Sequence, residues 1–392
     1  MSVQLLTDAH MVLPGEGIQS GNLLLADGKI AAVNPARVPT GASTLDCEGR
    51  LLTPGLIDMH AHGIERHFYH WDQPSGEFAA ALRVLPKYGT TCVVPTIVPL
   101  AKAALLEPLA RLFETLPHGG AVVPGFHLEG PFVALGGAAC PTLPGDLGLL
   151  EDLIAACGRR VSIMSLSPEQ QGIIPVIQRL REQNILPFIT HTRASVEQTE
   201  TAMEAGARHA THFYDVFPVP EETDAGARPV GAVEAILADP RASVDFICDG
   251  VHVHPAAIRA AVAAKGWKQV MLITDSNIGS GLPGGEYDTP WGYRVRVAPG
   301  DAARHATQGF LAGSALTMDL GMKNLLRWLA SALTPAQIWA MGTLNPARLL
   351  GLSNKGRIAP GADADLVLWD QQLNVVKTLV GVQCVFTRNE TL

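Results

Sequence analysis

The sequence predicts an α/β protein: a TIM-like (β/α)8 barrel accompanied by a small β-sandwich domain that both chain ends form. In the middle of the chain, short apolar runs alternate with longer helical segments such as GEFAAALRVLPKYG and SVEQTETAMEAG. Strand–helix alternation favours parallel strands joined by helical crossovers, and eight units within about 300 residues match a (β/α)8 barrel. A doubly wound open sheet is the alternative fold, but it does not need eight units.

The runs that we assign to barrel strands are short and apolar, and most carry polar residues in their carboxyl-terminal half. In chain order they are LLTPGLIDMHAH, TTCVVPTIVP, AVVPGFHLEGPF, VSIMSLSPE, ILPFITHTRA, HATHFYDVF, SVDFICDGVH and QVMLITDSN. At the two chain ends, short strands alternate with turns instead, and Asp27-Gly28 is a strong hairpin signal. We expect residues 1–53 and 355–392 to form the β-domain and residues 54–354 to form the barrel.

The composition excludes several classes of protein. Hydrophobic residues make up 47% of the chain and charged residues 17%, which is typical of a globular protein with an extensive core. The formal net charge of −8 and the absence of a basic run argue against a nucleic-acid partner. Neither a signal peptide nor an apolar run of roughly 18 residues is visible, so no membrane partner is expected. The 6 scattered cysteines lack a C-x-x-C pair, which favours buried thiols in a cytoplasmic protein.

Residues that can bind a metal end five of the predicted strands. They are His60 and His62 in the first run, Glu129 in the third, His191 in the fifth, His212 in the sixth and Asp275 in the eighth. Side chains two residues apart in a strand point the same way, so the first two histidines face one space. Each residue alone could be an ordinary strand-end polar group. Because reactive groups of a (β/α)8 barrel collect at this end of the strands, the set as a whole indicates a metal centre.

The types of ligand restrict the metal. Imidazoles and carboxylates without thiolates suit Zn, Fe, Mn, Co or Ni rather than Ca or Mg, and a hydrolytic site favours zinc. Six ligands are more than one tetrahedral ion requires. The set therefore has room for one or two divalent ions, with Glu129 placed to bridge them.

These motifs together resemble the N-acetylglucosamine-6-phosphate deacetylase family of the amidohydrolase superfamily. The matching segments, which span nearly the whole chain, are PGLIDMHAHG, HLEGPF, THTRA, THFYD, LITDS, GFLAGSALTM, TLNPARLLGL and GRIAPGADADLVLWD. The resemblance implies a metal-bearing barrel with a β-sandwich built from both chain ends. It also implies metal-dependent hydrolysis of the acetamide of N-acetylglucosamine-6-phosphate, or of a closely related N-acetylamino sugar phosphate, to the amino sugar phosphate and acetate.

The resemblance assigns the metal ligands and the proton-transferring group. It makes Glu129, His191 and His212 the ligands of the principal metal, and His60 and His62 match members that keep a second metal position. Asp275 matches the residue that acts as both general base and general acid.

The resemblance also implies a set of substrate contacts. His252 in DGVHVH resembles the family's substrate-binding histidine, and Asp215 and Val216 lie at the end of the sixth run, where further contacts are expected. Arg228 in GARPVG stands where the family has a phosphate-binding arginine contributed by the neighbouring subunit, so a homodimer is expected. A backbone stretch that lines the sugar pocket is matched by Leu311, Ala312, Gly313 and Ser314.

Two segments depart from the family pattern. After HLEGPF the family has Lys-Lys-Gly-(Ala/Thr)-His-Asn-Pro, whose histidine contacts the sugar, whereas this chain reads VALGGAACPTLPG with Pro141 near that position. In THFYDVF, Asp215 replaces a substrate-contacting Asn, and the loop that follows is longer and more acidic. A carboxylate near a phosphate repels it. The alternative is therefore an amidohydrolase acting on a different N-acyl amino sugar, an N-acyl amino acid or a cyclic amide.

Two further classes fit the sequence less well. Similar barrels with paired metals hydrolyse phosphoesters, but Glu129 stands here in place of a lysine that could be carbamylated. A catalytically inactive binding protein would need neither the complete ligand set nor Asp275.

Overall fold

The computed structural model describes residues 3–70, 75–99, 106–113, 116, 119–137 and 140–388. Its central sheet has eight parallel strands in the order β15-β14-β13-β12-β11-β10-β9-β6. Their bounds are β6 (Leu56–Ala61), β9 (Thr90–Ile97), β10 (Phe126–Glu129), β11 (Val161–Leu166), β12 (Leu186–Ile189), β13 (His209–Ala210), β14 (Ser243–Ile247) and β15 (Val270–Ile273). Each of the eight predicted runs contains one of these strands, so the predicted (β/α)8 barrel is confirmed.

The sheet closes on itself between its first and last strands. The backbone N–H of Asp275, just past β15, donates to the carbonyl of His60 in β6 (2.9 Å), and the N–H of His62 donates to the carbonyl of Ser276 (2.8 Å). Strands such as β6, β9 and β15 are buried along their whole length, as expected for parallel strands covered on both faces. Closure brings the first and eighth strand ends together, which places His60, His62 and Asp275 side by side.

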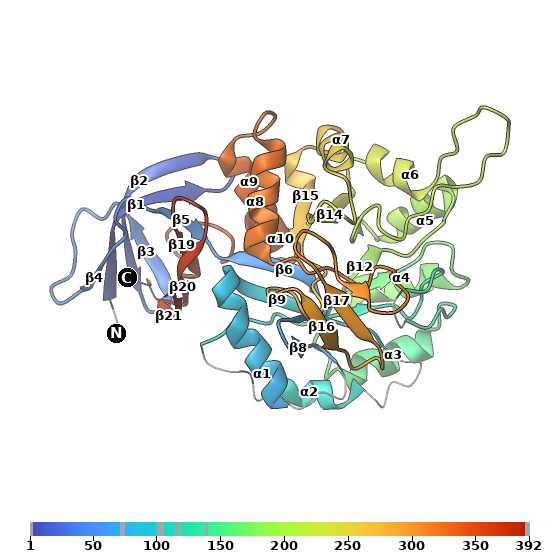
Figure 1. The fold of residues 1–392 in the computed structure, drawn as a ribbon, viewed down its shortest axis with the longest axis horizontal. Helices are drawn as coiled ribbons and strands as arrows, with labels where there is room; N and C mark the ends of the chain where they lie inside the picture. The colour runs from blue at the N-terminus through green and yellow to red at the C-terminus, as the bar shows by residue number, and fades with distance from the viewer. Residues whose placement is uncertain are drawn as a thin grey trace.

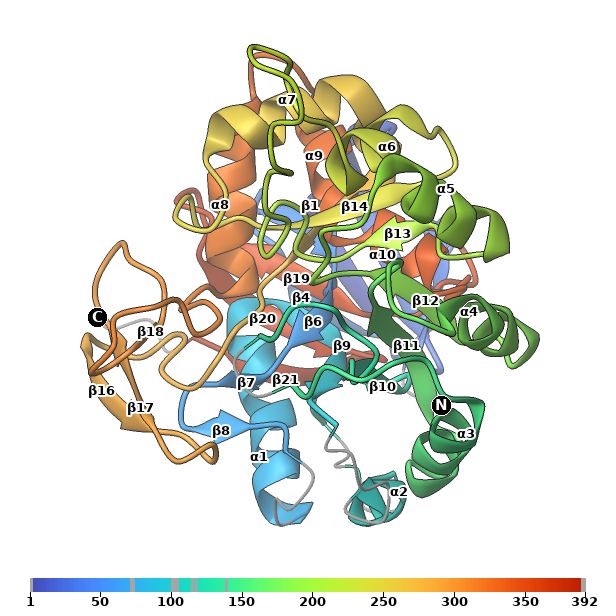
Figure 2. The ribbon, with the colours of Figure 1, turned by 90° about the vertical axis from the view of Figure 1, so that its right-hand side faces the viewer.

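Helices cover the outside of the barrel (Figure 2). They are α1 (Ser75–Val84), α2 (Pro108–Leu112), α3 (Leu147–Ala156), α4 (Ile173–Glu182), α5 (Val196–Ala205), α6 (Ala232–Ala238), α7 (Pro255–Lys265), α8 (Met318–Leu329), α9 (Pro335–Gly342) and α10 (Leu344–Leu349), with 3-10 turns η1 (Leu85–Tyr88) and η3 (Trp267–Gln269). The predicted segment SVEQTETAMEAG is α5, which a capping box between Ser195 and Gln198 starts and Gly206 ends. No helix in the described part of the chain is both long and apolar enough to span a membrane.

The second unit is a sheet drawn from both chain ends, beside the barrel in Figure 1. Its strands are β1 (Val3–Leu13), β2 (Gly17–Ala26), β3 (Lys29–Val33), β4 (Ser43–Asp46), β5 (Leu51–Pro54), β19 (Leu366–Trp369), β20 (Val375–Val380) and β21 (Gln383–Thr387). The junction is antiparallel pairing of β5 with β19. The sheet has its own buried cluster, including Leu6, Leu52 and Leu366, separate from the barrel core. The domain boundaries themselves stay a prediction.

An insertion between β15 and α8 was not predicted from the sequence. It forms a three-stranded antiparallel sheet of β16 (Gly285–Asp288), β17 (Arg294–Val297) and β18 (Arg304–His305). A short hairpin, β7 (Gly63–Ile64) with β8 (His67–Phe68), follows the first barrel strand. Both lie to one side of the barrel strands in Figure 2, and residues of the insertion contribute to the wall of the site described next.

Candidate metal centre and active site

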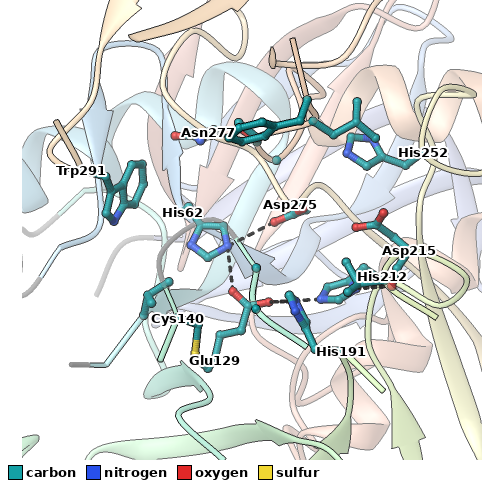
Figure 3. Close-up of a pocket in the computed structure, with 18 of the residues that line it drawn as sticks. His62, Glu129, Cys140, His191, His212, Asp215, His252, Asp275, Asn277 and Trp291 are labelled. Carbon is teal, nitrogen blue, oxygen red and sulfur yellow. Dashed lines mark hydrogen bonds and ion pairs between the residues drawn. The ribbon is translucent and has the colours of Figure 1, made fainter. Parts of the chain in front are cut away.

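A cavity of about 510 Å³ lies at the carboxyl ends of the barrel strands (Figure 3). Five of the six predicted metal-binding residues line it: His62, Glu129, His191, His212 and Asp275. The sixth, His60, is completely buried, and its ring lies 5.1 Å from that of His62 between centroids. The structure therefore brings all six predicted donors to one place.

Glu129 is at the centre of this group. Its Oε1 lies 3.1 Å from His212 Nε2 and 3.3 Å from His191 Nε2, while its Oε2 lies 3.2 Å from His62 Nε2. Asp275 Oδ1 is 3.2 Å from Nε2 of both His60 and His62. Oε1 of Glu129 thus faces His191 and His212, with His60 Nε2 further away at 3.7 Å, and Oε2 faces His62.

Two compact groups of donors result, and they share one carboxylate. His60, His62 and Glu129 form one group, and Glu129, His191 and His212 form the other, with donor atoms within 4.8 Å of one another in each. Imidazole nitrogens and a carboxylate oxygen are the donors that borderline divalent metals prefer. Both groups therefore have the kinds of donor that suit a divalent metal.

Two of the predicted ligand histidines have their second ring nitrogen occupied by a backbone carbonyl. His191 Nδ1 lies 3.1 Å from the Leu135 carbonyl, and His212 Nδ1 lies 3.2 Å from the Asp215 carbonyl. A carbonyl can only accept, so Nδ1 carries a proton in both rings, and Nε2 is the nitrogen that faces Glu129 and can bind a metal once it carries no proton. This fixes the tautomer and the ring orientation that metal binding needs.

His60 is oriented through a buried hydroxyl. Thr211 Oγ1 lies 3.4 Å from His60 Nδ1 and donates to Asp245 Oδ2 (3.0 Å). Asp245 Oδ1 also accepts the backbone N–H of His212 (2.5 Å). One completely buried carboxylate therefore supports ligands of both donor groups.

Three of the proposed ligands have left-handed backbone conformations. The φ angles are 47° at His191, 36° at His212 and 49° at Asp275. Non-glycine residues rarely adopt this region, and such strain clusters where a side chain must be aimed at a site. Each of these residues lies just past the end of a strand, so the backbone turns there and directs the side chain into the cavity.

The backbone around Asp275 is held by the stretch predicted to line the sugar pocket. Leu311, Ala312 and Gly313 line the cavity as predicted, whereas Ser314 does not. Ser314 is completely buried, and its N–H donates to the carbonyl of Asp275 (2.7 Å). Ser314 therefore holds the backbone of Asp275, the predicted proton-transferring residue.

The electrostatics of the site favour positive charge. Burial alone lowers the pKa of His62, but hydrogen bonds to Asp275 and Glu129 more than reverse this and raise it to about 10. Burial likewise opposes protonation of His212, and Glu129 raises its pKa to about 10. The carboxyl pKa of Asp275 is shifted below its usual value because the hydrogen bonds to His60 and His62 outweigh burial. A divalent cation bound here would likewise be stabilised by the negative charges of Glu129 and Asp275.

His252 and Asp215 lie on the opposite side of the cavity from Glu129 in Figure 3, and both line it as predicted. Ligand atoms of Asp215, His252 and Asp275 lie within 4.8 Å of one another. His252 Nδ1 is 2.6 Å from Asp249 Oδ2, and this contact raises the pKa of His252 against the effect of burial. Val216, also predicted to contact substrate, lines the cavity with its backbone φ at 54°.

Arg228 does not line this cavity. Its side chain is 83% exposed and pairs with Glu234 (Nη2 to Oε1, 2.9 Å). It belongs to a segment between β13 and α6 that extends away from the barrel (Figure 1). Among the described residues that line the cavity there is neither a lysine nor an arginine.

The segment after Phe132 contributes contacts that the sequence did not predict. The N–H of Leu135 donates to the carbonyl of His191 (3.0 Å), complementing the ring contact between the same two residues. Gly137 packs so closely that a Cβ there would lie 2.2 Å from His191 Cε1. Cys140 Sγ donates to the carbonyl of Glu129 (3.2 Å). This departure from the family pattern thus encloses two proposed metal ligands.

Aromatic residues of the insertion, also missed from the sequence, complete the wall. Trp291, Tyr293 and Phe310 line the cavity, joined by Asn277 and by Val98 after β9. Burial and the charge of Asp275 raise the pKa of Tyr293 to about 12. Phe310 belongs to the matched segment GFLAGSALTM, but the sequence carried no motif for Trp291 and Tyr293, because their segment has neither barrel periodicity nor a strand-end position.

Comparison with known proteins agrees with this geometry. Residues 51–391 match the model of the Amidohydrolase family. The chain belongs to the amidohydrolase family. It is 34% identical over 376 residues to the N-acetylgalactosamine-6-phosphate deacetylase of Escherichia coli O157:H7, covering 94% of this chain and 95% of that protein. It is 31% identical over 361 residues to the N-acetylglucosamine-6-phosphate deacetylase of Lysinibacillus sphaericus, covering 91% and 90%.

A solved structure extends this likeness to the whole fold. A variant of N-acetyl-D-glucosamine-6-phosphate deacetylase from Mycobacterium smegmatis, in complex with N-acetyl-D-glucosamine-6-phosphate, superposes with a TM-score of 0.85 at 28% identity, covering 99% of this chain and 100% of that one. Within the amidohydrolases the chain is therefore a member of the N-acetylglucosamine-6-phosphate deacetylase family, as its motifs predicted. Amidohydrolases are metal-dependent, and the donor groups around Glu129 suit a metal.

Proposed function

We propose that this amidohydrolase hydrolyses the acetamide of N-acetylglucosamine-6-phosphate to the amino sugar phosphate and acetate. The observation that carries the proposal is the juxtaposition of Asp275 with the imidazoles around Glu129, in a chain related to deacetylases along nearly its whole length. We infer zinc as the metal, because the donors are imidazole and carboxylate and the reaction is hydrolytic. Because this substrate is a charged phosphate ester, the cytoplasm is the compartment we propose.

The ligands we propose are Glu129, His191 and His212 for the principal ion and His60, His62 and Glu129 for a second. When bound, a divalent ion acts as a Lewis acid and makes water more acidic. Asp275 takes a proton from the attacking water at Oδ1 and returns it to the departing amine. His252, on the far side of the cavity, is placed to bind the acetamide or the sugar.

The phosphate requires a cation that the cavity of one chain does not provide among its described lining residues. We propose that Arg228 of the partner subunit supplies it in a homodimer. Val219 and Val230, which flank Arg228 on the extended segment, are 80% and 54% exposed. Exposed apolar residues on such a segment are typical of an interface.

A complementation experiment tests this arrangement. Arg228→Ala and Asp275→Asn homodimers should both be weakly active. Mixed dimers should regain activity, because one of their two sites combines an intact Asp275 with the partner's Arg228. No recovery in mixed dimers would place Arg228 in its own chain's site, or outside any site.

N-acetylgalactosamine-6-phosphate is the second candidate substrate. It differs from the first only at carbon 4, and the relative with 34% identity carries this activity in its name. The chemistry at the metal is the same for both epimers.

Acetate release tests the proposed function directly. Metal-loaded protein should deacetylate N-acetylglucosamine-6-phosphate, lose activity when a chelator removes the metal, and recover it with zinc. Asp275→Asn is the catalytic control. Absence of acetate release from either epimer by protein with bound metal would refute the proposal in favour of a different amide.

A further inference from the structure

The insertion between β15 and α8 presents an ordered aromatic stack to the cavity. Trp291 and Tyr293 stack with ring centroids 6.0 Å apart at 21°, and Tyr293 stacks on His305 at 4.9 Å and 20°. Trp291 also makes an edge contact with the His62 ring (6.4 Å, 83°). The stack therefore runs from the insertion to one of the proposed metal ligands.

The backbone around these two rings is fixed by a tight turn. Thr289 donates to the Tyr293 carbonyl through both its backbone N–H (3.1 Å) and its hydroxyl (2.6 Å). Gly292, between the two aromatic residues, has φ at 79°, which a side chain would disfavour. Both rings are thus held in position by the chain itself, without a ligand.

The hydroxyl of Tyr293 has no hydrogen-bond partner among the described residues, although its oxygen is shielded from solvent. Two other buried polar atoms share this condition, Tyr69 Oη and Asn345 Oδ1, but those residues do not line the cavity. A buried hydroxyl without a partner is costly, so native proteins rarely leave one unpaired. Because Tyr293 lines the cavity, a molecule bound there can supply the partner.

The surroundings restrict which part of the substrate that partner is. The acetamide must lie at the Glu129–Asp275 side, where the proposed metal ligands are. The phosphate needs a cation, and a neutral phenol beside a tryptophan is a poor substitute. Of the three parts of the substrate, this leaves the sugar ring as the partner of the Tyr293 hydroxyl. The ring carries hydroxyl groups that can accept a hydrogen bond and apolar C–H groups that can pack against an aromatic wall.

We propose that Tyr293 Oη donates a hydrogen bond to a hydroxyl of the sugar ring, with Trp291 forming the apolar wall beside it. This inference rests on the proposed function. It makes Tyr293 a specificity-determining residue and gives the chain a sugar contact from the insertion. The segment after Phe132, which lacks the family's histidine, need not provide it.

The test is Tyr293→Phe, which removes one oxygen and keeps the stack. Tyr287→Phe is the matched control, because its hydroxyl belongs to the same insertion but already donates to the Pro283 carbonyl (2.6 Å). With N-acetylglucosamine-6-phosphate, Tyr293→Phe should lower kcat/KM about 10- to 100-fold, mainly through KM, since the contact is made in both ground and transition states. Tyr287→Phe should stay within about twofold, and both variants should bind as much metal as the unmodified chain.

Deoxy sugars identify the partner. We would compare kcat/KM of the unmodified chain and Tyr293→Phe on three substrates, which lack the hydroxyl at carbon 1, 3 or 4. On the substrate that lacks the hydroxyl bound by Tyr293, the two proteins should have equal kcat/KM. On the other two substrates, Tyr293→Phe should show the same loss of kcat/KM as on the parent sugar. An equal penalty on all three, or no penalty on the parent sugar, would overturn the inference while leaving the proposed function intact. No acetate release by the unmodified chain would instead overturn the proposed function and this inference with it.

Discussion

The contact between Gly137 and His191 leads to a sharp prediction for metal binding. An alanine Cβ at position 137 would lie 2.2 Å from His191 Cε1, 3.0 Å from Nδ1 and 3.1 Å from Nε2. Gly137 is not among the residues with positive φ, so the alanine backbone is unstrained and the steric contact alone is tested. The ring cannot give way freely, because Leu135 holds its Nδ1 at 3.1 Å.

The expected size of the effect follows from the distance. To reach ordinary van der Waals contact, the imidazole or the segment must move by about 1 Å, and a displacement of that size in an active site can cost on the order of 10²-fold in rate. Loss of the carbonyl that orients a metal-bound histidine typically costs about 10- to 100-fold in metal affinity. We therefore expect Gly137→Ala to weaken metal binding about 10- to 100-fold.

The assay is zinc titration against a competing chromophoric chelator, followed by kcat/KM at saturating zinc. Gly136→Ala is the matched control, because nothing lies within 4 Å of a Cβ built at that neighbouring glycine. It should leave metal affinity within about twofold of the unmodified chain. Equal metal affinity in the two variants would refute the role of this segment in positioning His191.

Two further predictions address the chemistry and the second unit. Asp275→Asn should lower kcat about 10²- to 10⁴-fold. Metal analysis should still find at least one ion per chain, because Glu129 and its histidines remain. Unchanged turnover would exclude Asp275 as the proton-transferring group. Lys355 lies between Asp365 (2.5 Å) and Asp363 (2.9 Å), so Lys355→Met should lower the free energy of unfolding by about 1–3 kcal/mol at pH 7 in urea titrations. The ion pairs hold the pKa of Asp363 below its usual value despite burial. The ionised carboxylate therefore contributes its full share to the free energy of unfolding above about pH 4, the usual pKa. This contribution is lost as the pH falls through the lower pKa of the folded state. The difference in stability between the two proteins should therefore shrink below pH 4, and a difference that persists there would contradict the electrostatic explanation.

The sequence was sufficient for the barrel and for the gathering of the proposed ligands. The strands are apolar runs ending in polar residues, and the topology of a parallel barrel puts all those ends on one rim. His60 and Asp275 lie 215 positions apart in the chain, yet closure of the sheet makes them neighbours (3.2 Å). The two residues are neighbours because the sheet closes into a barrel, and the alternation of strands and helices in the sequence predicts that barrel.

The remaining features depend on packing that no local pattern encodes. The insertion with Trp291 and Tyr293 forms short strands joined by turns that contain glycine, and its position over the cavity depends on tertiary packing. Leu135 acts through its backbone, which any residue type could supply. Ser314 was predicted to line the pocket, but its hydroxyl instead donates a hydrogen bond to the backbone carbonyl of Thr274 (2.6 Å). Residue type predicted which donors the fold gathers, but it did not predict the groups that hold them in place.

The central claim is that the cavity around Glu129 and Asp275 deacetylates a phosphorylated amino sugar. The most direct measurement is kcat/KM of zinc-loaded protein for N-acetylglucosamine-6-phosphate against unphosphorylated N-acetylglucosamine. The account predicts a preference for the phosphate of about 10- to 100-fold, since a charge-assisted hydrogen bond such as one from Arg228 contributes about 1.5–3 kcal/mol. Equal kcat/KM for the two sugars, or turnover of neither, would contradict it.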